Sequence, residues 1–450
     1  MTGIITDSLK RVLLDNLITE VATAGASYYI GIGNSQDWDS SDTAPTPTNT
    51  LREERNLRLR LQSIKSAEDV SYVVPRNNWT AGTIYSGWDD NASSHPTTPY
   101  FVITDDNSVY MCLKQGRDNT GAAIASTVKP TGASISSFLT ADGYMWKFLY
   151  TLTAGDANKY LTANYMPVKF ITSTDSSSPA ADIEQKGIQD AAIPGQIGSV
   201  RIINGGSGYV SAPTVTIIGD GDSAQATAII SGGSVVNISL DSNGSGTILH
   251  GSGYTSATVL FSTGTATARV VLPPVGGFGA NPINDLRAKA VMFNTKPSGA
   301  ENDTFITDND FRQIALIKNP KVPVTDSDFT QSSGFAAKAL KFVTPVATAF
   351  TADNTIEGAS SGAKAYVDTY NVSTGILRYH QTEATGFTNF SGGEAVSETD
   401  GAGSGTLDSS GTFDPGAIDF RSGEILYIEN RAAISRAVDQ TEDIKIVIQL

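Results

Sequence analysis

Residues 422–450 read SGEILYIENRAAISRAVDQTEDIKIVIQL, and they end in a regular alternation of residue types. The apolar members of that alternation are Ile444, Ile446, Ile448 and Leu450. A period of two places such residues on one face of a strand. Chain ends usually fray unless they are tied into a sheet. We therefore expect this segment to be a strand whose apolar row, Leu450 included, is built into a core.

The composition predicts a β-rich chain. The protein has 450 residues, so two or three domains are expected from length alone. Hydrophobic residues make up 40% of the sequence and aromatic residues 8%, which is enough to form real cores. The 43 glycines accompany many short runs in which Val, Ile and Thr alternate with other residues. This combination is typical of strands joined by turns, so we expect a mainly β fold.

The charge and the cysteine content exclude several classes of protein. The formal charge is −15 at pH 7, and an acidic surface repels phosphate backbones, so we expect no nucleic-acid partner. The one cysteine, Cys112, rules out an internal disulfide framework and a thiolate metal cluster. It lies in the run VYMCL, where we expect a small buried strand residue.

No membrane or export segment is expected. No apolar run approaches the length of a membrane span. Asp15 and Glu20 interrupt the apolar stretch that follows Lys10 and Arg11, which argues against a signal peptide. We expect the protein to be cytoplasmic when made, without a membrane partner.

Residues 7–24 carry the clearest helix pattern. Apolar residues recur there at spacings of three and four, at Leu9, Val12, Leu13, Leu17 and Val21. Asp7 is a suitable N-cap for this helix. We therefore expect one N-terminal helix in an otherwise β-rich chain.

The run NLRLRLQ at residues 56–62 predicts an amphipathic strand. Leucines alternate there with Arg58 and Arg60, which would form a basic outer row. A solvated strand face is the favoured interpretation, because most strands present some polar residues to water. The alternative is a docking surface for an acidic partner, and Arg58 and Arg60 are our candidates for that contact.

An internal repeat marks residues 195–275. The sequence GGSGYVSAPTVTI at 205–217 is echoed by HGSGYTSATVLF at 250–261, so that Tyr209 and Tyr254 occupy matching positions. We expect the glycines to adopt positive φ in a tight turn and each tyrosine to cover that turn. A second Gly/Ser/Thr-rich stretch covers 338–412.

These changes of composition predict one discontinuous host domain with two insertions. The host domain would comprise residues 1–194, 276–337 and 413–450. An inserted β-repeat module would occupy residues 195–275, and a second inserted β module would occupy 338–412.

Residues with catalytic or metal-binding chemistry are few. His95, His250 and His380 are not at ligand spacing, so a histidine metal site is not expected. No nucleophile-elbow sequence or phosphate-binding glycine loop is present. A Ser–His–Asp triad stays open, because its members meet only in space. The runs WDDN at 88–91, TDDN at 104–107 and GDGD at 219–222 could offer oxygen ligands to calcium, but solvated turns are favoured.

The four tryptophans allow a second kind of function. Trp146 lies in an apolar run and is expected in a core, whereas Trp38, Trp79 and Trp88 lie in loop sequence and could stack on sugar rings. We expect no catalytic residue, no metal and no cofactor.

Several stretches resemble one known family in the same order along the chain. They are YYIGIGNSQDW at 28–38, VVPRNNW at 73–79, VYMCLK at 109–114, DGYMWKFLYTL at 142–152, FRQIALIKNP at 311–320 and the C-terminal run 422–450. Together they resemble the baseplate wedge subunit of T-even-type contractile-tail phages, the gene-eight product family. The resemblance leaves out residues 195–275 and 338–412.

The resemblance implies a fold and a role. Members of that family form a layered β-sandwich with helices in the loops, pair as homodimers and contact neighbouring wedge proteins. They hold the baseplate in its ready state and move with it when the sheath contracts. The expected architecture is thus a β-sandwich host domain with one N-terminal helix, a few loop helices and two inserted small β modules. The expected location is the virion tail baseplate, with the host cytoplasm as the place of assembly.

The segment between the last two predicted strands contains further contact candidates. Asn430, Arg431, Asp439 and Gln440 would lie there. Hydrogen bonding within turns and caps is the favoured role for such residues, and a contact between subunits is the alternative.

The leading functional hypothesis is a non-enzymatic structural subunit of a phage baseplate wedge that takes part in virion assembly. The alternative is a tail appendage that binds a receptor or carbohydrate through the repeat module and the loop tryptophans. A third hypothesis is a glycosidase or lyase built on a β scaffold. Paired carboxylates could hydrolyse a glycoside, but such pairs carry little information in a sequence with 46 acidic residues.

Overall fold

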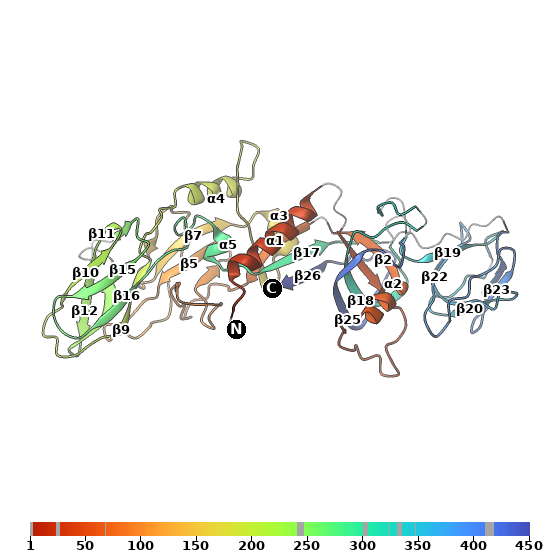
Figure 1. Cartoon of the computed structure of the whole chain (residues 1–450), viewed down its shortest axis with the longest axis horizontal. Helices are drawn as coiled ribbons and strands as arrows, with labels where there is room; N and C mark the ends of the chain where they lie inside the picture. The colour runs from red at the N-terminus through yellow and green to blue at the C-terminus, as the bar shows by residue number, and fades with distance from the viewer. Residues whose placement is uncertain are drawn as a thin grey trace. The chain divides into compact units, whose positions relative to one another are not determined.

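The structure is a computed structural model, and it confirms a mainly β chain (Figure 1). Strands hold 38% of the residues and helices 11%. The described residues are 3–23, 28–67, 69–240, 247–299, 305–323, 325–330, 335–346, 348–409 and 418–450. Among them, no helix is long and apolar enough to cross a membrane.

The chain divides into two compact units. Unit 1 comprises Met1–Leu14, Ser71–Met292 and Ile448–Leu450, and unit 2 comprises Asp15–Val70 and Phe293–Val447. Four elements have residues in both, namely α1 (Asp7–Ala22), β3 (Asp69–Pro75), β17 (Ala290–Thr295) and β26 (Ile444–Gln449). The five-segment domain organisation stays a prediction, and its boundary between residues 412 and 413 lies outside the described residues.

Unit 1 contains most of the short strands. Its helices are α3 (Ala154–Tyr160), α4 (Ala180–Asp190) and α5 (Pro282–Asp285). Its strands before the repeat are β4 (Phe101–Ile103), β5 (Ser108–Lys114), β6 (Phe138–Leu139), β7 (Met145–Thr151) and β8 (Tyr165–Val168). Its repeat region contains β9 (Ser199–Asn204), β10 (Thr214–Gly219), β11 (Asp222–Ala224), β12 (Ala226–Ser231), β13 (Ser234–Ser239), β14 (His250–Ser252), β15 (Ala257–Phe261) and β16 (Thr267–Val271).

The sheet β4-β5-β7-β6 carries an aromatic core in unit 1. Tyr85, Tyr144 and Trp146 pack there, with the Trp146 ring stacked on Tyr144 at a centroid distance of 5.7 Å. Cys112 is fully buried in β5, as predicted, and Trp146 is a core residue, as predicted.

The repeat forms its own antiparallel sheet in the order β13-β12-β10-β15-β16-β9. Tyr209 and Tyr254 are buried at its two turns, and Gly208 and Gly253, which precede them, have φ of +81° and +76°. A methyl group on Gly264 would lie 2.3 Å from the Tyr209 ring, so the tyrosine covers the glycine backbone directly. The prediction is therefore confirmed for the positive φ of Gly208 and Gly253 and for Tyr209, whose ring also lies 3.0 Å from the position of a methyl group on Gly206. The Tyr254 ring instead lies against Gly219 and Gly221, outside the turn at residues 250–253.

Unit 2 is built from two sheets. The first has the order β2-β1-β18-β25, with β1 (Tyr28–Gly33), β2 (Leu61–Ser66), β18 (Asn309–Lys318) and β25 (Glu424–Arg436). The second has the order β19-β22-β21-β20-β23-β24, with β19 (Lys338–Lys341), β20 (Thr355–Gly358), β21 (Lys364–Asn371), β22 (Ile376–His380), β23 (Ala395–Glu398) and β24 (Ser404–Thr406). Buried Asp368 links them, because its backbone carbonyl accepts from Asn309 Nδ2 at 3.0 Å.

The C-terminal strand is only partly buried, which corrects one expectation. β26 belongs to the sheet β26-β17-β3-β8. Ile444 and Ile446 are buried, but Ile448 is half-buried and the Leu450 side chain is 41% exposed. The backbone of Leu450 is nonetheless held, because its N–H donates to the Lys289 carbonyl at 3.2 Å. The alternation therefore predicted the strand correctly, but burial ends before the last residue.

The predicted N-terminal helix is present as α1. Leu14 and Val21 are its buried residues, whereas Leu9, Val12 and Leu13 are each about half exposed. The apolar spacing thus identified the helix, although only part of the apolar set contacts the protein core.

The predicted strand at residues 56–62 is wrong. Most of that run belongs to α2 (Leu51–Leu59), and β2 begins only at Leu61. Thr50 is the N-cap of α2, where its hydroxyl accepts from the Glu53 N–H at 3.2 Å. A threonine followed three residues later by glutamate is a capping box, and this signal outweighs the short alternation of leucine and arginine.

Candidate interface around strand β25

The long strand β25 lies at the edge of the first sheet of unit 2. It pairs with β18 on one side only, among the strands that the structure describes. It has 13 residues, and it is at most half-buried along most of its length. Leu426 is 41% exposed on this strand. An exposed edge of this length presents unpaired backbone groups and favours pairing with another chain unless something covers it.

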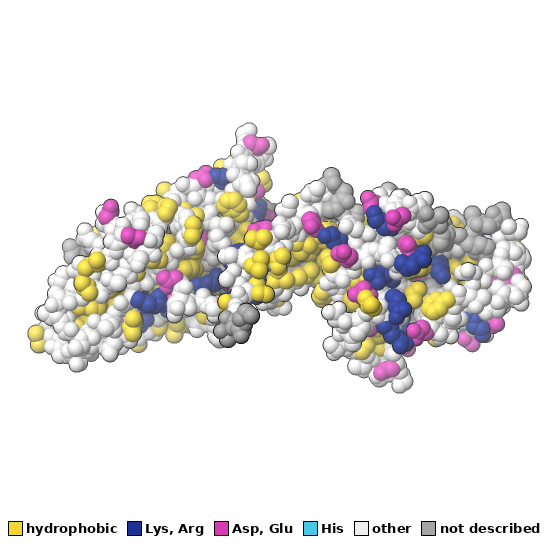
Figure 2. Space-filling model, viewed as in Figure 1, with side chains coloured by type: hydrophobic (Ala, Val, Ile, Leu, Met, Phe, Trp, Pro, Cys, Tyr) yellow, Lys and Arg dark blue, Asp and Glu magenta, His cyan; other side chains and the backbone are white. Residues whose placement is uncertain are grey.

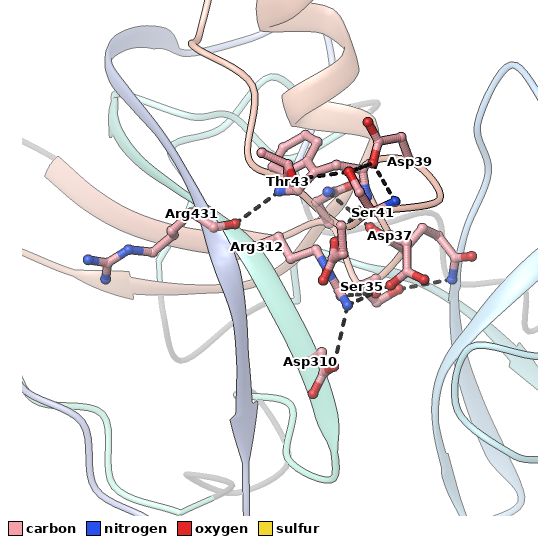
Figure 3. Close-up of polar contacts among 12 residues, drawn as sticks. Ser35, Asp37, Asp39, Ser41, Thr43, Asp310, Arg312 and Arg431 are labelled. Carbon is pink, nitrogen blue, oxygen red and sulfur yellow. Dashed lines mark hydrogen bonds and ion pairs between the residues drawn. The ribbon is translucent and has the colours of Figure 1, made fainter.

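The loop of residues 34–50 covers the middle of β25. The Trp38 indole N–H donates to the Arg431 carbonyl at 2.9 Å, and Asn430 Nδ2 donates to the Pro45 carbonyl at 3.0 Å. Figure 3 shows this loop beside β25, with Arg431 labelled on the strand. The described residues of the loop make these bonds at Asn430 and Arg431, and we take the segment around Leu426, the exposed large apolar residue of β25, as the candidate contact surface.

Arg312 of β18 fixes the loop. Its guanidinium contacts Asp42 at 2.8 Å, Asp37 at 2.7 Å and Asp310 at 3.6 Å, and also donates to the Ser35 carbonyl (Figure 3). The Arg312 side chain is only 5% exposed. Its hydrogen bond to Asp42 lowers the pKa of that carboxyl group. Asp37, Asp42 and the Ser35 carbonyl belong to the loop, so these charge-assisted bonds to one buried cation tie the loop to β18.

Arg58 and Arg60 do not form a basic outer row. The Arg58 side chain is 10% exposed and lies 3.5 Å from Glu54, and its Nη2 donates to the Gly423 carbonyl at 2.7 Å. Burial lowers the pKa of Arg60. Because the segment is helical, the Arg58 side chain is buried, and its hydrogen bond connects α2 to Gly423, the residue before β25. Whether either residue contacts a partner stays a prediction.

The other contact candidates divide between a strand and a turn. Asn430 and Arg431 lie inside β25 and not between strands as expected, because β25 extends to Arg436 through an irregular pairing with β18. Gln313 Nε2 donates to Asn430 Oδ1 at 2.8 Å. Asp439 and Gln440 lie between β25 and β26, where Gln440 Nε2 donates to Glu442 Oε1 at 3.0 Å.

Sequence reasoning missed Arg312 and Trp38 as the residues that organise this site. The partners through which they organise the loop are distant in the sequence, since Arg312 is 270 residues from Asp42 and Trp38 is 393 from Arg431. The acidic composition of the loop was the only available signal, and acidic residues are common throughout the chain.

The histidines lie in separate environments. His95 hydrogen-bonds the Leu286 carbonyl at 2.8 Å, and His380 contacts Asp368 at 2.8 Å with both side chains buried. His250 lies between the Ser137 hydroxyl at 2.5 Å and the Ile197 carbonyl at 2.7 Å, where a triad would place a carboxylate. No group of three or more His, Cys, Asp or Glu residues suited to a metal occurs among the described residues.

The aspartates of the three candidate calcium runs are engaged in internal contacts. Asp89 pairs with Arg201 at 2.8 Å and also with Arg269. Asp220 accepts from the backbone N–H groups of Thr255 and Ser256, and these bonds, with the Thr255 hydroxyl, lower its pKa to about 2. The contacts of Asp89 are ion pairs, and the contacts of Asp220 are hydrogen bonds to a turn.

The loop tryptophans also make internal hydrogen bonds. Trp79 Nε1 donates to the Ser126 hydroxyl at 3.2 Å, and Trp88 Nε1 donates to the Asp285 carbonyl at 3.1 Å. Trp88 is buried, so its ring is not available for stacking on a sugar.

The fold and the candidate interface are those of a β-rich protein with a long edge strand, part of which an anchored loop covers. A family model described as Bacteriophage T4, Gp8 matches residues 391–450. The matched segment includes β23, β24, β25 and β26. It relates this part of the chain to a phage baseplate protein and indicates a tail component of the virion. No curated protein matches the sequence.

Proposed function

We propose that this protein is a structural subunit of a phage tail baseplate wedge and that it links neighbouring wedge proteins. The observation that carries the proposal is the match of residues 391–450 to the T4 Gp8 family. The ordered resemblance of five further stretches between residues 28 and 320 supports the same family outside the matched segment. The role is mechanical, without catalysis, cofactor, nucleic acid or membrane.

The segment of β25 around Leu426 is the proposed partner surface. Sheet edges offer backbone hydrogen bonds over several residues, and side chains such as Leu426 add apolar contact. The ion pairs of Arg312 with Asp37 and Asp42 keep the loop in place beside the middle of β25, next to this segment. In this role the chain pairs as a homodimer, binds other wedge proteins and moves with the baseplate when the sheath contracts.

Co-purification tests the proposal. The chain, carrying an affinity tag, is co-expressed with the other baseplate proteins of its own phage. The complex is then isolated, and its mass is measured by light scattering. We expect a homodimer alone and a defined complex with at least one wedge protein. A chain that recovers none of those proteins under conditions in which they fold would contradict the assignment.

Two matched substitutions locate the surface. Leu426→Arg places a charge on the proposed surface of β25, whereas Val438→Arg places the same charge in the exposed turn between β25 and β26. We expect the first substitution to abolish recovery of the partner and the second to leave it unchanged. Equal recovery with both variants would move the interface away from β25.

A further inference from the structure

A small cavity in unit 2 lies between the end of α2 and the residues that follow β22. Its volume is about 220 Å³, and its described lining residues are Asn56, Leu59, Arg60, Thr382, Glu383 and Ala384. Both lining segments belong to unit 2. A water molecule takes up about 30 Å³ in the liquid. The cavity therefore has room for a group of about the size of one amino-acid side chain.

Arg60 brings an unpaired positive charge to this cavity. Its half-buried side chain makes no hydrogen bond and no ion pair with the residues that the structure describes. Burial lowers the pKa of Arg60, and the more distant charges of Glu53 and Glu383 only partly oppose that change. A cation that has lost part of its hydration without gaining a bonded counter-charge is stabilised by an anion that reaches it.

The acidic side chain of the lining is already engaged. Glu383, the one acidic residue among the described lining residues, lies 2.6 Å from Arg52. On the same helix Arg58 lies 3.5 Å from Glu54. Figure 2 shows Lys and Arg side chains gathered over the part of unit 2 that contains α2. Glu383 and Arg58 thus have counter-charges, whereas Arg60 offers its guanidinium to a ligand.

Neutral hydrogen-bond donors stand beside Arg60. The Asn56 side-chain amide makes no hydrogen bond with the described residues, and the Thr382 hydroxyl accepts from the Ala384 N–H at 3.2 Å, which does not use its own O–H. The backbone of Arg60 is fixed at both ends. Its N–H donates to the Asn56 carbonyl at 3.1 Å, and its carbonyl accepts from the Asn34 N–H at 3.0 Å. The cavity therefore presents donors from a fixed backbone.

We propose that this cavity binds a single carboxylate group, carried by an acidic side chain or by the C-terminal residue of a partner protein. The Arg60 guanidinium would donate to both carboxylate oxygens, a geometry that suits arginine, and Asn56 and Thr382 would supply further hydrogen bonds. A phosphate group carries nearly two negative charges at neutral pH, more than one unpaired cation balances. The inference goes beyond the proposed function and does not depend on it, since it uses only residues of unit 2 and no baseplate protein.

Binding of small carboxylates to the full-length protein tests the site. N-acetylglutamate N-methylamide presents a side-chain carboxylate, and N-acetylalanine presents a chain-terminal one. N-acetylglutamine N-methylamide matches the first probe in shape but has no charge. Saturation-transfer difference NMR at low salt gives the dissociation constants. We expect a carboxylate probe to bind at least tenfold more tightly than the glutamine analogue, and the tighter of the two carboxylates identifies the source of the ligand.

Two matched substitutions locate the bound carboxylate. Arg60→Gln removes the charge at the cavity, whereas Arg55→Gln removes the same charge from an exposed position of α2 outside the described lining. We expect Arg60→Gln to weaken carboxylate binding at least tenfold and Arg55→Gln to leave it unchanged. Circular dichroism melting shows whether each variant is folded. The comparison of the glutamate and glutamine analogues needs only the wild type, so it decides the question even if Arg60→Gln does not fold.

Three results would overturn the proposal. They are absence of carboxylate binding by the wild type, equal binding of the glutamate and glutamine analogues, and an equal loss in Arg60→Gln and Arg55→Gln. Inorganic phosphate that binds more tightly than either carboxylate would also overturn it, because the cavity would then select a different anion.

Discussion

Arg312 shows how one side chain can organise a surface. It is buried in β18, and its contacts with Asp37 and Asp42 tie a polar loop beside β25. The sequence could predict the strand that contains Arg312 from its apolar residues, but not the partners of the guanidinium. Such pairings depend on the tertiary fold, because residues 270 positions apart have no local relation.

Removing that guanidinium should loosen the loop and lower stability. We expect Arg312→Met to reduce the free energy of unfolding by about 2 kcal/mol, below the usual cost of breaking a buried ion pair, since the aspartates are partly solvated. Urea denaturation measures the change. Arg421→Met, at a side chain 92% exposed, should change stability by less than about 0.5 kcal/mol. Equal effects of the two substitutions would mean that Arg312 does not hold the loop.

A buried carboxyl group in unit 1 predicts a pH dependence. Burial raises the pKa of Asp285 to about 7, while one oxygen accepts from the Gly279 N–H at 2.9 Å. The folded state therefore keeps a proton that the unfolded chain releases above about pH 4. This group costs stability progressively as the pH rises from about 4 to about 7.

Asp285→Asn removes that titration. The unfolding free energies of the wild type and the variant should lie close together at about pH 4.5, and the variant should be the more stable by a few kcal/mol at about pH 8. Urea denaturation at both pH values measures the difference. Parallel stability profiles for the two proteins would show that Asp285 does not titrate in this range.

At the scale of elements, the sequence predicts the helices and strands in which apolar residues recur at a regular spacing. The helix α1, the strand β5 and the Gly–Tyr turns of the repeat were all foreseen, because apolar spacing and glycine placement determine them locally. The prediction for residues 56–62 is wrong because the alternation there is short and the N-cap at Thr50 starts a helix that includes most of the segment. The contact candidates Asn430 and Arg431 were misplaced because irregular pairing lengthens β25 beyond the expected strand.

The glycine turns of the repeat can be tested as a matched pair. Gly208 and Gly264 have nearly equal φ, +81° and +82°, but only Gly264 has the Tyr209 ring against the position of a methyl group. We expect Gly208→Ala to cost about 1–2 kcal/mol from backbone strain alone. Gly264→Ala should cost clearly more, because the ring must move. Thermal melting compares the variants, and equal costs would mean that Tyr209 does not cover the turn.

At the scale of the whole molecule, the repeat region should be separable. The Gly198 N–H donates to the Val271 carbonyl at 2.9 Å, and Ser199 pairs with Val271 between β9 and β16, so the two ends of this region are adjacent. We expect a chain in which a short glycine linker replaces residues 197–272 to stay folded, since nearby ends make such a deletion tolerable. Circular dichroism and thermal melting measure this. An unfolded product would show that the repeat sheet is needed by the remainder of unit 1.

The most direct test of the structural role is a density map of the purified phage tail, obtained by electron cryo-microscopy. The account predicts that this chain is found in the baseplate as paired copies, with residues 391–450, and in particular the segment of β25 around Leu426, against neighbouring wedge proteins. A map in which the chain is missing from the baseplate, or forms a trimeric tip that contacts only solvent and the host surface, would contradict it.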